Sequence, residues 1–442
     1  MKDRWGDYMN ELIEVKEYDT IIGNYKFKEQ YKYINETAFL DLIEFIHAFD
    51  SSNEESDVLD FIKIGYKRKV GETVSFKNYV GIIQIKNNYQ IQILPKINFA
   101  KGKHDETKKV FIKMLSSMKD FPSKIFTNAN LKVDQMSLYE IFINIYLQEV
   151  QRLVKRGLKS YYVKQSDNLS TFKGKLDVVQ HLKYNLVHKE RFYVEFDEYQ
   201  INRPENKIVK ATLLKLKKLT TSFENSKEIR QLLIAFEQVQ PSINYDKDFS
   251  RIIIGRNNKD YKNLINWSKV FLKNKSFTSF VGTESVKALL FPMEKVFESF
   301  IAKNVKKTFS NLGWQISIQD KGYYLFNSLN GINYNKFALR PDIVLQRPDG
   351  AVIVLDTKWK SLINNKNKNF GILQADMYQM YAYAKKYNTS QVWLIYPANN
   401  ELHGDRIIVF DSDDDVKVSL FFIDLTSIEF EMKRLVKLLS RY

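Results

Sequence analysis

The stretch RPDIVLQRPDGAVIVLDTKWK, residues 340–360, constrains the fold more tightly than any other part of the sequence. Two apolar runs flank the tripeptide Pro-Asp-Gly at 348–350, an order typical of a three-residue hairpin loop. Proline fixes φ at the first loop position, and glycine takes the left-handed position of a G1 bulge. This loop sets the antiparallel register and places Asp342 directly opposite Asp356.

The loop length decides where the two carboxylates point. A two-residue turn would shift the register by one and send them to opposite faces of the sheet. Lys358 lies two residues after Asp356, so the alternation of side chains along a strand aims both at the same face. We therefore expect two carboxylates and one ammonium group on a single patch.

The alternative interpretation of this patch is a cross-strand salt bridge on a solvated sheet. Apolar residues occupy both faces of the two runs, however, as in a strand pair that is covered on both sides. Neighbouring carboxylates in partly dry surroundings repel each other and need a neutralising charge. Because paired carboxylates and water suit Mg²⁺, the stretch predicts a magnesium site.

Composition narrows the partners. The chain has 442 residues, enough for several domains, and its net charge of +16 favours a polyanionic partner, although a lysine-rich composition can also follow from an AT-rich genome. It has no cysteine, which excludes disulfides and thiolate zinc sites, and its five histidines form no ligand cluster. No run approaches the ~18 apolar residues of a membrane helix, so we expect a cytoplasmic protein without a membrane segment.

The pattern predicts a mixed α/β, multidomain protein with three segments. Residues 1–109 are β-rich and end in two alternating strands within 78–97, joined at Asn87-Asn88. Residues 110–286 are largely helical and basic; in 206–219, apolar residues recur at helical spacing with lysines between them. The favoured interpretation is that these lysines form a solvated helix face. The alternative is that they contact the phosphates of a nucleic acid. Residues 287–442 form the third segment.

The third segment shows the order αβββαβ. The pattern predicts a helix over 292–309, a strand over 314–319, the hairpin, a helix over 373–387 and a strand over 391–396. The last step implies a parallel strand pair joined by a helical crossover. This order, with Arg340-Pro341-Asp342 followed by Asp356-Thr357-Lys358, resembles the PD-(D/E)xK nucleases.

Most of the chain resembles the McrC family, the nuclease subunits of McrBC-type modification-dependent restriction systems. The resemblance rests on the order of several short pieces, each weak alone. They are ILPKI (93–97), FKGKLD (172–177), DEYQINRPENKIVKATL (197–213), FESF (297–300), RPD (340–342) and DTKWK (356–360). The chain looks longer than a minimal member of the family.

The resemblance implies Mg²⁺-dependent endonucleolytic hydrolysis of DNA, with Mn²⁺ able to substitute. Asp342 and Asp356 would hold the metal, with the Thr357 carbonyl as a further ligand. Lys358 would position or deprotonate the attacking water. The alternatives are another PD-(D/E)xK nuclease, such as a RecB-like exonuclease or a resolvase, and a non-catalytic scaffold that binds DNA or protein.

A third acidic residue is expected from the first helix of this fold. Glu294 and Glu298 are four apart and share one helix face, so periodicity does not separate them. The match of FESF to the family favours Glu298, and an exposed carboxylate paired with a lysine is the alternative for either. On the second helix, Gln379 and Tyr383 have the QxxxY spacing of related nucleases, which ordinary amphipathic packing explains equally well.

The sequence contains neither a GxxxxGK[ST] loop nor a Rossmann glycine pattern, so we expect the chain to hydrolyse no nucleotide. The resemblance implies a separate AAA+ GTPase of the McrB type that recognises modified DNA and assembles as a ring. The N-terminal and middle segments are expected to dock there, with dimerisation or higher assembly through the ring. The alternative is that these segments form a DNA-binding platform.

Overall fold

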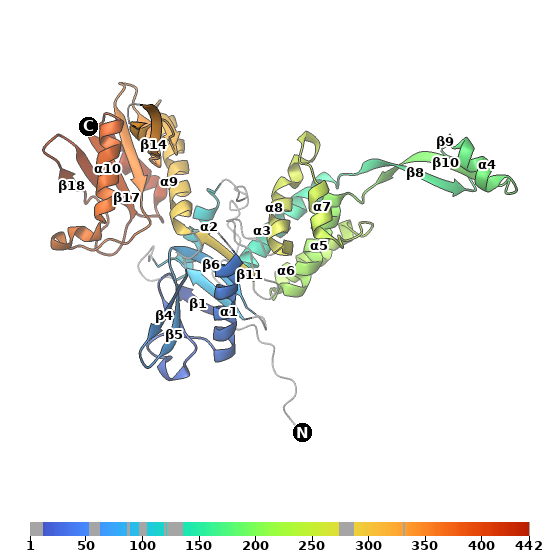
Figure 1. Ribbon diagram of the computed structural model, residues 1–442, viewed down its shortest axis with the longest axis horizontal. Helices are drawn as coiled ribbons and strands as arrows, with labels where there is room; N and C mark the ends of the chain where they lie inside the picture. Colours follow the sequence, from blue (N-terminus) through green and yellow to red (C-terminus); the bar gives the residue numbers. More distant parts are fainter. Residues whose placement is uncertain are drawn as a thin grey trace. The chain divides into compact units, whose positions relative to one another are not determined.

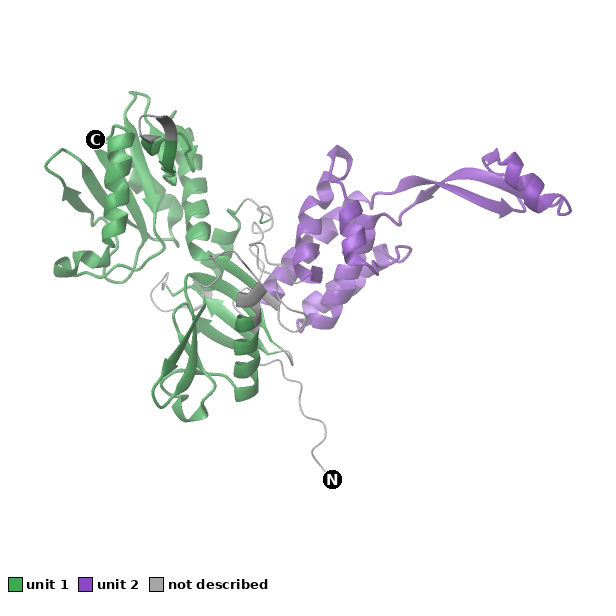
Figure 2. Cartoon of the chain, in the orientation of Figure 1, with its two compact units in different colours: residues 1–138, 276–442 green, residues 139–275 purple. Residues whose placement is uncertain are grey.

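The computed structural model describes residues 12–52, 62–85, 89–96, 104–118, 121, 136–273, 287–329 and 332–441. Its contacts divide the chain into two compact units, shown in Figure 2: unit 1 is Met1–Leu138 with Ser276–Tyr442, and unit 2 is Tyr139–Lys275. The mixed α/β class is confirmed. The division into three separate segments stays a prediction.

The N-terminal part of unit 1 holds two small sheets. Strands β6 and β7 are antiparallel neighbours, as predicted, while their Asn87-Asn88 connection lies outside the described residues. Their alternating apolar residues and those of helix α1 form one core. The first sheet has the order β1 (Leu12–Lys16), β7 (Gln90–Leu94), β6 (Tyr79–Gln84), β11 (Lys287–Pro292). The second has the order β3 (Lys32–Tyr33), β2 (Thr20–Ile22), β5 (Gly71–Phe76), β4 (Ile62–Lys67); η1 is Tyr25–Phe27, α1 Glu36–Ser52 and α2 His104–Leu115.

Strand β11 connects the C-terminal part of unit 1 to the N-terminal sheet. It starts at Lys287, where the sequence predicted a new segment, yet it pairs with β6 in the N-terminal sheet. Pro292 ends this strand and is the N-cap of helix α9 (Met293–Ser310), one residue before the helix begins. The Met293 N–H donates to the carbonyl of Asn78 at 2.8 Å, which fastens the start of α9 to the N-terminal sheet.

A six-stranded sheet forms the C-terminal part of unit 1. The hairpin has the predicted register: Ile343 pairs with Leu355, and Gly350 has φ +87° in a loop closed by Arg347. Strands β16 and β17 are parallel across helix α10, also as predicted. The sheet order is β12 (Gln315–Ile318), β15 (Ile343–Gln346), β16 (Val352–Thr357), β17 (Gln391–Pro397), β19 (Lys417–Ile423), β18 (Ile408–Asp411). The remaining elements are the hairpin β13 (Tyr324–Leu329) and β14 (Ile332–Ala338), η5 (Lys366–Gly371), α10 (Gln374–Lys386) and α11 (Ile428–Leu439).

Unit 2 is a group of helices that carries a long β arm. The arm was not expected, because the sequence indicated a largely helical segment. Strands β8 (Tyr161–Leu169) and β10 (Phe192–Gln200) pair along nine residues each and reach away from the helices, with β9 (Lys175–Leu176) and α4 (Val178–Asn185) at the tip (Figure 1). The helices are α3 (Leu138–Arg156), α5 (Pro204–Leu219), α6 (Phe223–Ala235), α7 (Tyr245–Arg251) and α8 (Lys262–Lys273), with η4 at Arg256–Tyr261.

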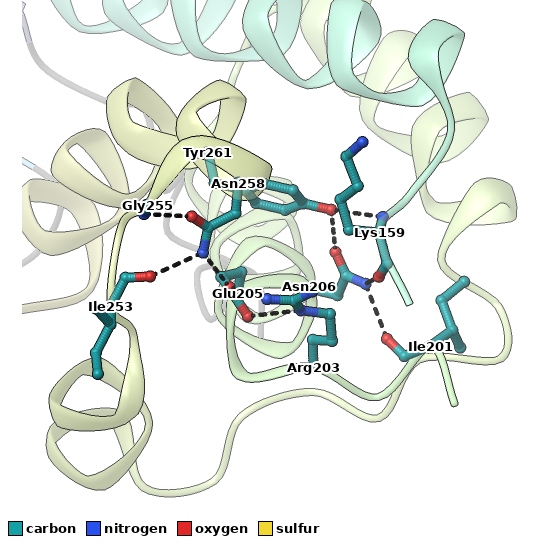
Figure 3. Close-up of polar contacts among 9 residues, drawn as sticks. All are labelled: Lys159, Ile201, Arg203, Glu205, Asn206, Ile253, Gly255, Asn258 and Tyr261. Carbon is teal, nitrogen blue, oxygen red and sulfur yellow. Dashed lines mark hydrogen bonds and ion pairs between the residues drawn. The ribbon is translucent and has the colours of Figure 1, made fainter. Parts of the chain in front are cut away.

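A buried polar network fixes the base of the arm (Figure 3). The Asn206 amide donates to the carbonyl of Lys159, just before β8, at 2.9 Å and to that of Ile201, just after β10, at 2.8 Å. Its oxygen accepts from the Tyr261 hydroxyl at 2.6 Å. Glu205 next to it accepts from Arg203 and Asn258, both at 2.8 Å. The first turn of the helix over Pro204–Leu219 therefore holds the bases of both β8 and β10 in place.

Within the described residues, no helix is long and apolar enough to cross a membrane.

Candidate functional site

A polar pocket of about 480 Å³ opens in unit 1 where the hairpin meets α9, α10 and two turns of the N-terminal sheet. Its volume lies within the range of roughly 300–1,000 Å³ that is usual for ligand sites. The residues that line it are Tyr18, Asn78, Glu294, Glu298, Arg340, Asp342, Asp356, Thr357, Lys358, Trp359, Lys360, Leu373, Asp376 and Gln379.

Asp342 lies immediately before β15 and is tied to the neighbouring strand. Its Oδ2 accepts from the backbone N–H of Thr357 at 2.7 Å and from the Thr357 hydroxyl at 2.6 Å. Its Oδ1 faces the Gln319 amide at 3.4 Å. Burial raises the pKa of Asp342, and the two bonds from Thr357 partly offset that effect.

Asp356, near the end of β16, is 2% exposed. Burial first, and then the charge of Asp342, raise its pKa. The Lys358 ammonium lies 2.8 Å from Oδ2 and forms an ion pair with it. The predicted patch of two carboxylates and one ammonium group is therefore present.

Glu298 and Glu294 both line the pocket but contact different neighbours. The Gln319 amide donates to Glu298 and faces Asp342, so this glutamine bridges the two carboxylates. Burial, followed by the charge of Asp342, raises the pKa of Glu298 to about 7. Glu294 instead accepts from the Asn78 amide at 3.2 Å. Glu298 is thus coupled to the aspartates, and Glu294 faces the N-terminal sheet.

Helix α10 contributes the QxxxY pair. The Lys358 ammonium donates to Oε1 of Gln379 at 3.0 Å, and the Gln379 amide donates to the hydroxyl of Tyr383 at 2.8 Å. Asp376, one turn earlier, lies 3.9 Å from the same ammonium. Burial lowers the pKa of Lys358, but Asp356 and the other carboxylates outweigh it and the net shift is upward. This lysine is held charged.

The pocket fits a hard divalent cation. The described residues contain no group of three histidine, cysteine or carboxylate side chains placed to hold a metal. A cation here would therefore rest on Asp342, Asp356, a main-chain oxygen such as that of Thr357, and water. Mg²⁺ is commonly bound in this way, through one or two carboxylates with several waters retained. The observation that supports the fit is the pair of buried carboxylates in one open pocket, where the charge of Asp342 raises the pKa of Asp356 and a cation would offset the repulsion.

The sequence missed three residues that line the pocket, and Gln319, which contacts two of its carboxylates. Asp376 precedes Gln379 by one helical turn, so the QxxxY pattern was a usable signal for it. Gln319 directly follows β12 and has φ +52°, a left-handed conformation that no sequence pattern predicted. Tyr18 and Asn78 belong to turns far away in the sequence and carried no signal.

Fold and pocket together define a multidomain α/β protein in which one hairpin brings two aspartates and a lysine into an open polar pocket. The chain belongs to the McrBC family: the model described as "McrBC 5-methylcytosine restriction system component" matches residues 74–397. The family resemblance seen in the sequence is thereby confirmed. A comparison with curated proteins found no match.

Two solved structures are similar. One is a chain of the refined half-complex from the tetradecameric assembly of Thermococcus gammatolerans McrB AAA+ hexamers with bound McrC. It has 18% identity and a TM-score of 0.71, covering 97% of this chain and 100% of that one. The other is from the cryo-EM structure of the Thermococcus gammatolerans McrBC complex, with 23% identity, a TM-score of 0.49, and coverage of 67% and 88%. The first likeness supports the same overall fold.

Proposed function

We propose that the chain is the McrC-type nuclease subunit of a McrBC restriction system and hydrolyses DNA phosphodiester bonds with Mg²⁺. The observation that carries this proposal is the convergence of Asp342, Asp356 and Lys358 in one open pocket of a McrBC-family chain. The order of α9, β12, the hairpin, α10 and β17 supports the proposal of a PD-(D/E)xK domain. Glu298 is the third acidic member.

Each residue has a definable task. Asp342, Asp356 and the Thr357 carbonyl would hold the cation, which when bound supplies charge neutralisation at the phosphate and a lowered pKa of water. Thr357 and Gln319 orient Asp342 through hydrogen bonds. Lys358, held by Gln379, orients the attacking water and offsets negative charge at phosphorus. Glu298, with its raised pKa, is suited to accept a proton near neutral pH.

The test is Mg²⁺-dependent cleavage of methylated and unmodified plasmids by the full chain with its GTPase partner. Asp356→Asn should abolish cleavage and keep DNA binding, and Lys358→Ala should slow cleavage by about 10²–10⁴-fold. Asp411→Asn, the same change on the exposed edge strand β18, is the matched control. Undiminished cutting by Asp356→Asn would refute the assignment and favour the scaffold alternative, whereas a requirement for DNA ends would favour an exonuclease.

The partner proposed is an AAA+ GTPase of the McrB type that recognises modified DNA. The similar half-complex contains McrB AAA+ hexamers with bound McrC, and this chain has no nucleotide-binding loop motif of its own. The arm of unit 2 is suited to docking because it carries exposed apolar side chains. Tyr162, Tyr199 and Val187 are 70%, 64% and 83% exposed.

Deleting the arm is a cleaner docking test than deleting residues 1–109, because the N-terminal sheet also holds β11. A chain in which a short turn replaces residues 162–198 should lose GTPase binding and stimulation. Alanine at the exposed Lys217 and Lys218 of α5 is the control for a DNA-binding role. Partner binding should resist salt, whereas phosphate contacts weaken steeply with it. Full stimulation by the armless chain would place the docking site elsewhere.

A further inference from the structure

One wall of the proposed nuclease pocket, formed by Tyr18 and Asn78, lies outside the nuclease motifs. Tyr18 and Asn78 come from two turns of the N-terminal sheets, and both line the pocket beside Asp342 and Asp356. The Tyr18 hydroxyl donates to the Asn78 side chain, and the Asn78 amide donates to Glu294 at the start of α9. A continuous chain of contacts therefore runs from the N-terminal turns to the pocket.

The turn that carries Tyr18 is built to present it. The Asp19 carboxylate accepts from the Lys16 N–H at 2.8 Å, and the Tyr18 N–H donates to the carbonyl of Phe76 at 2.7 Å. These bonds hold Tyr18 at φ +68°, a left-handed backbone that is unfavourable for a bulky residue. Asn78 has φ +53°, also left-handed. Such outliers persist where surrounding structure imposes them, often at functional sites.

Glu17 anchors the same turn to the motif that carries the catalytic lysine. It is 1% exposed, and its carboxylate accepts from the indole N–H of Trp359 at 3.2 Å and from the Lys96 N–H at 3.0 Å. Trp359 directly follows Lys358, and its ring packs on Phe297 of α9 with centroids 5.4 Å apart. The position of Tyr18 is thus tied to both catalytic elements.

The chemistry of the wall suits a nucleic-acid strand. Tyr18 is 44% exposed and lines the pocket while its hydroxyl is held, so part of its aromatic surface is open in a fixed place. The Lys96 ammonium lies over the ring, 4.9 Å from its centre, and Arg340, Lys358 and Lys360 line the pocket. An aromatic ring among cationic side chains is the usual means of holding a strand by stacking and phosphate contacts.

We propose that Tyr18 contacts the DNA strand next to the scissile phosphate, so that the N-terminal segment completes the nuclease site. The inference rests on the proposed nuclease function and adds a substrate-positioning residue to it. Tyr18 does no chemistry: it sets where the strand lies relative to Asp356 and Lys358. The N-terminal segment therefore has a role in the pocket besides any role in partner docking.

The decisive variant is Tyr18→Gly, because glycine suits φ +68° and relieves the backbone while removing the ring. With the full chain and its GTPase partner, Tyr18→Gly should raise KM for DNA by about tenfold, the loss expected for one stacking contact, and leave kcat nearly unchanged. Its Tm should not fall. Tyr18→Phe keeps the ring and should retain most of the affinity. Tyr66→Gly, a 77% exposed tyrosine on β4, is the control.

Affinity for a short fluorescent DNA single strand without Mg²⁺, whose bases are free to stack on the ring, separates this inference from the function it rests on. Wild-type affinity in Tyr18→Gly, with cleavage intact, would overturn the contact and leave the nuclease standing. A wild-type chain that never cuts but binds DNA about tenfold more tightly than Tyr18→Gly would overturn the nuclease proposal and keep Tyr18 as a DNA contact. Equal losses in Tyr18→Gly and Tyr66→Gly would also refute the inference, because they would indicate a nonspecific effect.

Discussion

Glu17 is a carboxyl group with almost no access to solvent, and its surroundings explain its acidity. Burial is the main cause that raises its pKa from 4.5 to about 7, and the charge of Glu294 adds to it. The hydrogen bonds from Lys96 and Trp359 and the Lys96 charge offset part of the rise. Between these two pH values the folded protein holds a proton that the unfolded chain has released, so stability falls as the pH rises.

The first prediction concerns that pH dependence. Glu17→Gln stays neutral and keeps an acceptor oxygen for Trp359, so it should unfold with a free energy up to about 3 kcal/mol higher than wild type at pH 8 and equal to it near pH 4. Urea unfolding at both pH values measures this. Glu72→Gln, an exposed carboxyl group on β5, serves as the control. A wild-type pH profile in Glu17→Gln would contradict the burial argument.

A second prediction at the residue scale concerns the cation. Burial raises the pKa values of Asp342 and Asp356, so protons compete with Mg²⁺ more strongly at pH 5 than at pH 8. At pH 8 and a hundredfold excess over Kd, Mg²⁺ should stabilise the protein by about 2.7 kcal/mol, and by less at pH 5. Thermal unfolding with Mg²⁺ or EDTA measures the difference. Equal stabilisation of Asp356→Asn would place the ion elsewhere.

At the scale of elements, the network at the base of the arm explains a sequence piece, NRPEN, that has no role in the proposed nuclease chemistry. NRPEN supplies Arg203, the first-turn Pro204, and the buried Glu205 and Asn206. The lysine stripe of α5 has a similar explanation. Lys210 donates to the carbonyl of Phe236 at 2.9 Å and Lys215 to that of Leu272 at 3.1 Å, so two of its ammonium groups are structural.

The third prediction tests the clamp on the arm. Asn206→Ala leaves the carbonyls of Lys159 and Ile201 without their donor, so it should destabilise unit 2 by about 1–3 kcal/mol. Hydrogen exchange should speed up along β8 and β10 before it does in α3. Lys218→Ala, on the exposed side of the same helix, is the control. Unchanged exchange in the arm of Asn206→Ala would show that packing alone holds the arm base.

At the scale of the molecule, the two ends of the chain share one unit. The sequence pattern predicted that a third segment begins at 287. Strand β11 nevertheless pairs with β6, and Glu17 bonds Trp359, so the N-terminal sheet supports the pocket. Unit 2 is inserted between these parts and has its own core.

The fourth prediction follows from this division. A fragment of residues 287–442 should aggregate or unfold near room temperature, because β11 loses its partner strand and becomes an exposed apolar edge. A chain with a flexible linker in place of unit 2 should keep a cooperative transition and bind Mg²⁺. Circular dichroism and analytical ultracentrifugation compare the two. A stable, monomeric, metal-binding fragment 287–442 would contradict the shared unit.

Elements with local signals could be predicted from the sequence. The hairpin register followed from Pro-Asp-Gly at 348–350 and strand alternation, and the crossover pair from the apolar runs around α10. The arm strands β8 and β10 were not predicted. Few of their side chains are buried, so their sequences show no alternating apolar face.

The composition of the pocket follows from tertiary contacts that no local sequence pattern predicts. Glu294 and Glu298 share a helix face, and the contact with Gln319 links Glu298 to Asp342. Tyr18, Asn78 and the partner of β11 lie hundreds of residues from the hairpin, and no local propensity encodes which distant surfaces meet. Residue chemistry and the periodicity of helices and strands can be recognised in short stretches of sequence. Contacts between segments that are distant in the sequence depend instead on the packing of the whole fold.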